Sequence, residues 1–217
     1  MTFARDERLA LADLLTRLGP DQPTLCAGWK TIDLAAHLVM RERRPDAGLG
    51  VLGGPLAGHT RRVQGRYSSR NSFPRLVELI RAGPPRLSLF ALPGADERGN
   101  GIEFFVHHED IRRAQPGWEP RDLPPGVSDL LWQRLRTARL MLRRAPVGVE
   151  FAREVDAWHE GDAPLRITAK ARAPVVTVTG PPAELTMWAF GRTGGARVRL
   201  EGSDPDVAAL AAPGWRH

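Results

Sequence analysis

The feature that most constrains this 217-residue chain is a change in the period of its apolar residues near Pro146. Before that point, apolar side chains recur with the 3.6-residue period of amphipathic helices. After it, the period shifts towards the two-residue alternation of strands. The sequence therefore predicts a mainly α protein, with a helical bundle over residues 1–145 and a small α+β domain over residues 146–217.

The first part is predicted to hold five helices, each marked by an apolar stripe and by breaking residues at its ends. They are expected at 3–18, 31–44, 73–82, 102–114 and 125–144. Residues 46–71 are rich in Gly, Arg and Ser, which favours a loop with one short helix around 47–52. The segment GADERGNG (94–101) predicts a turn-rich break before the fourth helix.

The second part is predicted to alternate strands and short helices. Its segment PVVTVTG is dominated by β-branched residues, and ARVRLEG alternates Val198 and Leu200 with Arg197 and Arg199. Strands are expected at 147–154, 165–171, 174–180 and 196–202, and helices at 181–190 and 204–211.

The composition indicates the compartment in which the protein is expected and the classes of partner that it is expected to bind. No apolar run approaches eighteen residues, and the N-terminus MTFARDERLALADLL has acidic residues where a signal peptide needs an apolar region, so a cytoplasmic protein is expected. The single cysteine, Cys26, fits a reducing compartment. The net charge of +6 comes almost entirely from scattered arginines without interleaved aromatic residues, which argues against nucleic acid binding.

Two stretches place histidines in a helical context. His37 lies among apolar residues in TIDLAAHLVM, and GIEFFVHHED (101–110) contains His107 four residues after Glu103. At that spacing the two side chains lie one helical turn apart and can converge on one ion. His37 from a facing helix would complete a set of two imidazoles and a carboxylate, which suits zinc, iron, nickel or manganese. The spacing alone fits equally a core histidine and a hydrogen bond within one helix.

Asp110 and His108 lie beside this candidate set. Asp110 follows His107 by three residues and is placed to accept its ring N–H as an outer hydrogen-bond partner. His108 points about 100° away from His107 on a helix, so one helix does not easily present both rings to one ion. Three protein ligands leave a coordination position open, which is typical of a catalytic metal site.

Three segments resemble a known family. LCAGWKTIDLAAHL (25–38) resembles the entry to the second helix of the DinB-like family, in its mycothiol-dependent maleylpyruvate isomerase N-terminal branch. GIEFFVHHEDIRRA (101–114) resembles the second signature of that branch, an E-x-x-x-H followed three residues later by Asp. VVTVTGPPAELTMWAFGR (175–192) resembles the small α+β domain that often follows in this group. The segments RERRPDA (41–47) and HHED (107–110) look closest to a subgroup distinct from the isomerase itself.

The resemblance implies an up-down four-helix bundle that holds a divalent metal, usually zinc, between helices. The matching positions are His37, Glu103 and His107, with Asp110 in the motif beside them. Enzymes of this branch use a low-molecular-weight thiol, so the resemblance implies an isomerase or a thiol S-transferase with mycothiol as cosubstrate. Two imidazoles and one carboxylate leave a divalent ion with a net positive charge, which would stabilise a thiolate at neutral pH.

The expected partners are thus a small-molecule thiol and an electrophilic substrate, without nucleic acid or membrane, for a monomer or homodimer. Two alternatives stay open: a non-catalytic metal-binding module whose C-terminal domain binds a ligand or partner, and a hydrolase with Glu109 or His108 as its base. Cys26 is expected to pack near Trp29 rather than to act in catalysis. Arg192 is expected to serve as a helix C-terminal charge, with anion binding as the alternative.

Overall fold

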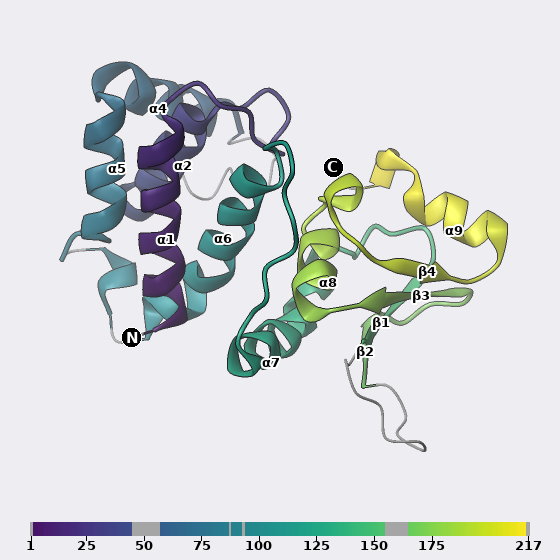
Figure 1. Cartoon of the computed structure of the whole chain (residues 1–217). Helices are drawn as coiled ribbons and strands as arrows, with labels where there is room; N and C mark the ends of the chain where they lie inside the picture. Colours follow the sequence, from purple (N-terminus) through teal and green to yellow (C-terminus); the bar gives the residue numbers. More distant parts are fainter. Residues whose placement is uncertain (1, 45–56, 87, 93, 155–164, 216–217) are drawn as a thin grey trace. The chain divides into compact units, whose positions relative to one another are not determined.

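The computed structural model describes residues 2–44, 57–86, 88–92, 94–154 and 165–215. The chain is mainly helical and contains one small four-stranded sheet (Figure 1). It divides into two compact units, Met1–Glu119 and Pro120–His217. The division falls before helix α7 (Pro125–Arg134), whereas the sequence placed it at residues 145 and 146. The difference arises because α7 packs against α8 (Pro182–Ala189) of the second unit.

The helical unit contains α1 (Phe3–Leu18), α2 (Thr31–Arg43), α4 (Ala57–Arg70), α5 (Phe73–Ala82), the short 3-10 helix η1 (Leu89–Ala91) and α6 (Ala95–Arg112). Helix α1 packs against α5 and α6, and α2 packs against α4 and α5 (Figure 1). The apolar stripes of these helices meet in one core, as their spacing predicts. Its largest fully buried members include Leu11, Leu15, Leu34, Leu38, Leu76, Ile80, Phe104 and Ile111.

The connection between α1 and α2 is fixed by local hydrogen bonds. Gly19 ends α1 with φ +80°, a conformation that favours glycine. The Lys30 N–H donates to the Asp33 carboxylate over 3.0 Å, and the buried Thr31 hydroxyl donates to the Gly19 carbonyl over 2.6 Å. Helix α2 therefore begins at Thr31 with Lys30 as its N-cap, and its start is tied to the end of α1.

Two of the sequence-based predictions for this unit are wrong. Residues 57–70 form helix α4 rather than a loop, and residues 95–101 belong to α6 rather than to a break. In α6, Gly99 and Gly101 serve close packing: a Cβ would lie 2.7 Å from the Phe90 ring at Gly99 and 3.2 Å from the Phe3 ring at Gly101. The short helix expected around 47–52 lies outside the described residues.

The second unit builds its core on the sheet, whose strand order is β2-β1-β3-β4. Strand β1 (Gly148–Arg153) pairs antiparallel with β2 (Arg166–Lys170) and parallel with β3 (Val175–Gly180), which pairs antiparallel with β4 (Arg199–Glu201). Helices α7, α8 and α9 (Asp204–Ala211) accompany the sheet (Figure 1). The core contains Leu135, Leu142, Val149, Phe151, Val176, Val178, Leu185, Trp188 and Leu210.

Two elements of this unit are shorter than their patterns predict. The helix expected over 125–144 is α-helical only to Arg134 and continues as the 3-10 helix η2 (Leu135–Leu140). The strand expected over 196–202 is regular only at residues 199–201, because β4 pairs with β3 only through Thr177, Val178 and Thr179. The other predicted strands of the unit form within a residue or two of their expected ends.

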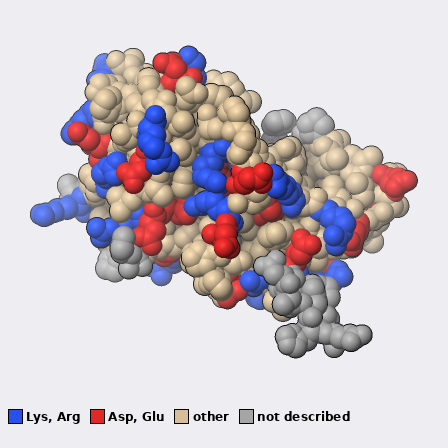
Figure 2. Space-filling model, in the orientation of Figure 1, with Lys and Arg blue, Asp and Glu red and all other residues tan. Residues whose placement is uncertain are grey.

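The described helices include none with the length and apolarity needed to cross a membrane. On the face drawn in Figure 2, Lys and Arg side chains are interspersed with Asp and Glu. Arg153 with Asp129 and Arg81 with Asp13 are examples of such neighbouring charges, with nitrogen–oxygen distances of 2.6 and 2.7 Å.

Candidate metal centre

The candidate site lies in the helical unit, between α2 and α6. Helix α6 carries Glu103 and His107 one turn apart on the same face, as the four-residue spacing requires. His37 comes from the middle of α2, where a run of buried residues packs that helix into the core. The structure thus brings together the three side chains that the sequence selected as metal ligands.

The three side chains converge on one point. The Nε2 atoms of His37 and His107 lie 3.3 and 3.2 Å from the same oxygen, Oε1 of Glu103. The centroids of the two imidazole rings are 5.1 Å apart. All three potential ligand atoms lie within 4.8 Å of one another, which is close enough for a single ion to contact each of them.

Burying these three ionisable side chains together costs free energy unless their charges are compensated. His37 is 2% exposed, and its ring lies 5.1 Å from the Trp29 ring. Its Nδ1 atom is buried and has no hydrogen-bond partner among the described residues. Of the three candidate ligands, Glu103 has the most exposed side chain, at 20%. A buried imidazole with an unpaired nitrogen calls for a functional explanation.

Asp110 supports His107 from the other side of its ring. The Asp110 side chain is fully buried, and its Oδ2 atom lies 2.9 Å from Nδ1 of His107. The same oxygen lies 3.2 Å from the Sγ atom of Cys26, in the segment between α1 and α2. Asp110 therefore favours a proton on Nδ1 of His107. When His107 loses its other proton, the one on Nε2, the Nε2 lone pair points at the candidate site.

The ionisation of the three side chains reflects this arrangement. Burial alone would lower the pKa of His107, but hydrogen bonds with Asp110, Cys26 and Glu103 raise it well above its usual value. Burial would raise the pKa of Glu103, but the two imidazoles bring it well below the usual range. Burial lowers the pKa of His37. In the metal-free site, His107 therefore carries a second proton between the Asp110 and Glu103 carboxylates. A metal cation would fit at the same place.

The second histidine of the pair faces elsewhere, as its helical position predicts. His108 Nδ1 lies 2.9 Å from Oε2 of Glu7 on α1, and both side chains are buried. Glu109 is also buried and forms ion pairs with Arg112 and Arg113 over 2.8 and 2.6 Å. Both side chains thus serve interactions away from the candidate site.

His59 lies on α4, and His159 and His217 fall outside the described residues. Arg192 belongs to the second unit, where its guanidinium donates to the Phe190 carbonyl over 2.6 Å at the end of α8. That contact is the one expected of a charge at a helix C-terminus.

Sequence reasoning missed two residues of the site. Cys26 was expected only to pack near Trp29, yet its thiol contacts Asp110. Arg41 was not considered, and its Nε atom lies 3.4 Å from Oε1 of Glu103. The signal for Arg41 was available, because it follows His37 by four residues on α2 and so shares its face. No spacing rule connects Cys26 with α6.

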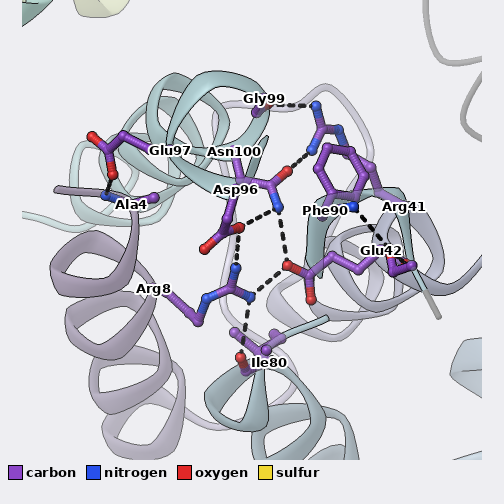
Figure 3. A network of polar contacts seen from close by, with 12 residues as sticks. Ala4, Arg8, Arg41, Glu42, Ile80, Phe90, Asp96, Glu97, Gly99 and Asn100 are labelled. Carbon is purple, nitrogen blue, oxygen red and sulfur yellow. Dashed lines mark hydrogen bonds and ion pairs between the residues drawn. The ribbon is translucent and has the colours of Figure 1, made fainter. Parts of the chain in front are cut away.

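A second polar cluster joins α1, α2 and α6, and we call it the arginine network: Arg8, Arg41, Glu42, Asp96 and Asn100 (Figure 3). Arg8 donates to Glu42 over 2.5 Å and to Asp96 over 2.6 Å. Asn100 donates to both carboxylates and accepts from Arg41, which also donates to the Gly99 carbonyl. Here every carboxylate faces a guanidinium group.

The residues at the candidate site fit a divalent metal. Two imidazole nitrogens and one carboxylate oxygen are a donor set that zinc, iron, nickel and manganese accept. Glu103 and Asp110 together carry two negative charges, which one divalent ion would balance. A second group, Cys26, His107 and Asp110, also brings potential ligand atoms together. Its 2.9 and 3.2 Å distances are those of hydrogen bonds to one carboxylate oxygen, so we interpret it as support for His107.

Beyond this geometry, comparisons of the chain with family models, with curated proteins and with solved structures found no match.

Proposed function

We propose that the chain is a divalent-metal enzyme of the DinB-like type that uses a low-molecular-weight thiol such as mycothiol, as an isomerase or a thiol S-transferase. The observation that carries the proposal is the convergence of His37 and His107 on one oxygen of Glu103, in a buried place open to solvent at Glu103. Zinc is the metal we expect, and a four-helix metal-binding bundle is the arrangement that the resemblance implies.

The charges around the site support a metal rather than a plain hydrogen-bonded cluster. A buried carboxylate is normally paired: Glu103 contacts two imidazoles and Arg41, and Asp110 contacts His107 and the Cys26 thiol. A second proton on His107 partly balances this charge in the metal-free protein, as the raised pKa of His107 indicates. A divalent ion would provide the same balance without protonated histidines.

The neighbouring residues favour thiol chemistry over hydrolysis. A metal-dependent hydrolase needs a general base near the open position. The two nearby candidates are buried and engaged elsewhere: His108 is hydrogen-bonded with Glu7, and Glu109 forms ion pairs with Arg112 and Arg113. A thiol cosubstrate needs no such base, because a bound metal would itself lower the pKa of the thiol.

In this proposal the chain's own residues bind and orient. His37 and His107 offer Nε2 lone pairs, Glu103 offers Oε1, and Asp110 keeps the His107 proton on Nδ1. Trp29, beside His37, shields that ring from solvent. The substrates expected are a small thiol and an electrophile that the thiolate adds to or displaces a group from.

A second candidate function is a metal-binding module without catalysis. It is favoured by the way the site joins separated parts of the chain: His37 comes from α2, Glu103 and His107 from α6, and Cys26 from the segment between α1 and α2. A metal there would fasten these elements together and contribute to folding. The second unit would then bind a partner or an apolar ligand.

Turnover with a thiol distinguishes the two candidates. Protein loaded with zinc is incubated with mycothiol and an electrophile, and loss of free thiol is followed. The enzyme proposal expects turnover that His37→Gln abolishes and that His108→Gln, the matched histidine outside the site, retains. The absence of turnover with any thiol, together with a large fall in melting temperature on chelation, would establish the non-catalytic module instead.

Interspersed charges on the face drawn in Figure 2 support the proposal that the partners are small molecules rather than nucleic acid. A nucleic acid ligand would call for a continuous basic surface with accessible aromatic residues. We propose a monomer or homodimer without membrane attachment.

A further inference from the structure

The segment Thr24–Trp29, which precedes α2, reaches both histidines of the candidate site. Trp29 lies against the His37 ring, with a centroid distance of 5.1 Å. Cys26 lies against Asp110, which in turn contacts His107. The main chain of the same segment is hooked onto α6, because the Leu25 N–H donates to the Asp110 carbonyl over 3.0 Å. This segment, which lies outside the ligand set, therefore contacts the His37 ring directly and the His107 ring through Asp110.

The segment is itself well fixed. The Thr24 hydroxyl accepts the Cys26 N–H over 3.2 Å and donates to the Trp29 carbonyl over 3.0 Å. The Trp29 N–H donates to the Cys26 carbonyl over 2.9 Å. The Cys26 thiol is thus presented to Asp110 by an ordered turn, rather than by a side chain that happens to lie nearby.

Within this arrangement one chain of contacts runs from the thiol to the site. Sγ of Cys26 lies 3.2 Å from Oδ2 of Asp110, which lies 2.9 Å from Nδ1 of His107. The opposite nitrogen of His107 lies 3.2 Å from Oε1 of Glu103. The same oxygen, Oδ2 of Asp110, therefore contacts both the thiol and the His107 ring, so a thiol donor can influence the orientation of the carboxylate.

We propose that Cys26 is a positioning residue of the metal centre: its thiol donates to Asp110 and so orients His107 for metal binding. This inference rests on the proposed metal site and adds a residue that touches neither metal nor substrate. Residues that hydrogen-bond to a metal ligand typically change metal affinity by about 10–100-fold. The Cys26 thiol is a weak donor and reaches the ligand only through Asp110. We therefore expect the effect of Cys26 at about the lower end of that range.

The test compares the dissociation constant for Zn²⁺ in four proteins: wild type, Cys26→Ala, Cys26→Ser and Ser88→Ala. Serine keeps a donor at the same position, whereas alanine removes it. Ser88 is the control, because its hydroxyl donates to a helix away from the site, to the Glu42 carbonyl of α2 over 2.8 Å, and accepts from the Phe90 N–H over 3.3 Å. We expect about tenfold weaker binding for Cys26→Ala, with wild-type binding retained by Cys26→Ser and Ser88→Ala. Equal binding by all four proteins, or Cys26→Ser as weak as Cys26→Ala, would overturn the proposal.

A second measurement uses wild-type protein and therefore needs no variant. Cys26 is the only cysteine, so iodoacetamide modifies a single thiol: a sulfur–carbon bond forms, iodide leaves, and the proton goes to the buffer. The alkylated wild-type protein has lost its S–H donor, and we expect weaker Zn²⁺ binding by it. Unchanged affinity after complete alkylation, checked by mass, would contradict the role of Cys26.

A third measurement separates this inference from the metal site itself. In metal-free protein labelled with ¹⁵N-histidine, NMR reports the bonding of each His107 nitrogen. We expect Cys26→Ala to shift the Nδ1 signal and Ser88→Ala to leave it unchanged. If wild-type protein binds no metal but the Nδ1 signal shifts, the metal proposal fails and the positioning contact stands. An unshifted signal would refute the positioning role whatever the metal does.

Discussion

Two polar clusters involve α2 and α6, one of them together with Arg8 of α1, and they differ in what balances their carboxylates. In the arginine network, Glu42 and Asp96 face the guanidinium of Arg8 over 2.5 and 2.6 Å, and Asn100 joins them to Arg41. In the candidate metal centre, Glu103 and Asp110 face imidazoles, with Arg41 touching the edge of Glu103. One cluster carries permanent positive charge at its centre, and the other does not.

This difference separates a structural cluster from a candidate binding site. In the arginine network, the buried Oε2 atom of Glu42 makes no hydrogen bond among the described residues, but it lies 3.7 Å from Nη1 of the neighbouring Arg43 and forms an ion pair with it. The buried Nδ1 of His37 has no such partner among the described residues. Three ligand atoms that converge within 4.8 Å, with one carboxylate among them and the Asp110 carboxylate beside them, are what a divalent ion requires. The predictions below test whether the two clusters behave as differently as their charges indicate.

The largest effect is expected when the arginine network loses its central charge. Arg8→Met leaves Glu42 buried without its main partner, and breaking a buried pair in this way costs about 3–5 kcal/mol of unfolding free energy. Urea denaturation of the metal-free protein measures the loss. Adding Glu42→Met should recover much of it, because the stranded charge is then removed. A loss below about 1 kcal/mol for Arg8→Met would show that this network is not structural.

A smaller effect, confined to the metal centre, is expected from Asp110→Asn. This change removes the carboxylate that holds His107 and should weaken Zn²⁺ binding by about 10–100-fold. Competition with a chelating dye measures the dissociation constant. The matched control is Asp96→Asn in the arginine network, which should leave Zn²⁺ affinity unchanged although it removes a partner of Arg8. Equal loss of affinity in both variants would mean that the two clusters are not distinct.

The pH dependence of metal binding follows from the raised pKa of His107. Since that pKa lies above its usual value in the metal-free protein, His107 holds a second proton at neutral pH, and the metal must displace it. Affinity should therefore rise with pH, by up to about tenfold per unit for one released proton, until the folded-state pKa of His107 is passed. Calorimetry in two buffers of different ionisation enthalpy counts the protons. Binding without proton release would contradict the protonated metal-free state.

The smallest effect is expected from a change at Arg41, which contacts residues of both clusters. Arg41 places a positive charge 3.4 Å from Glu103 at 20% exposure, where it competes with a cation for the carboxylate. Arg41→Met should therefore tighten Zn²⁺ binding by about 1 kcal/mol, or about fivefold. The gain should shrink at high salt, where the guanidinium of the wild-type protein is better screened. Weaker binding in the variant would instead mean that Arg41 orients Glu103.

The three candidate ligands could be predicted because they obey simple spacing rules. Glu103 and His107 share a helical face, and His37 lies in a segment whose apolar neighbours bury it. The link from Cys26 to Asp110 could not be predicted, because it depends on how the segment before α2 folds back onto α6. Such a contact has no period in the sequence.

The fold shows the same division between local and tertiary causes. Helices α1 and α5 end at Gly19 and Gly83 as their sequences predict, because the stop signals are local. Helix α4 was missed because it is mostly polar, and it buries mainly Val63, which packs with Tyr67 against Met40. Tertiary contacts therefore decided its state rather than the propensity of its residues.

The glycines of α6 misled the prediction for a related reason. Glycine weakens a helix by about 1 kcal/mol relative to alanine, so GADERGNG was interpreted as a break. At Gly99 and Gly101 the absence of a side chain makes room for the rings of Phe90 and Phe3. Only the packed structure shows this use of glycine.

The most direct test of the central claim is the Zn²⁺ stoichiometry of His107→Gln and His108→Gln beside the wild type. The two histidines are adjacent on α6 and both buried, but only His107 faces Glu103, whereas His108 faces Glu7. After equilibrium dialysis, elemental analysis should find one Zn²⁺ per chain in wild type and in His108→Gln, and a clear loss in His107→Gln. Equal metal content in the two variants, with both shown to be folded by circular dichroism, would contradict the assignment of the site.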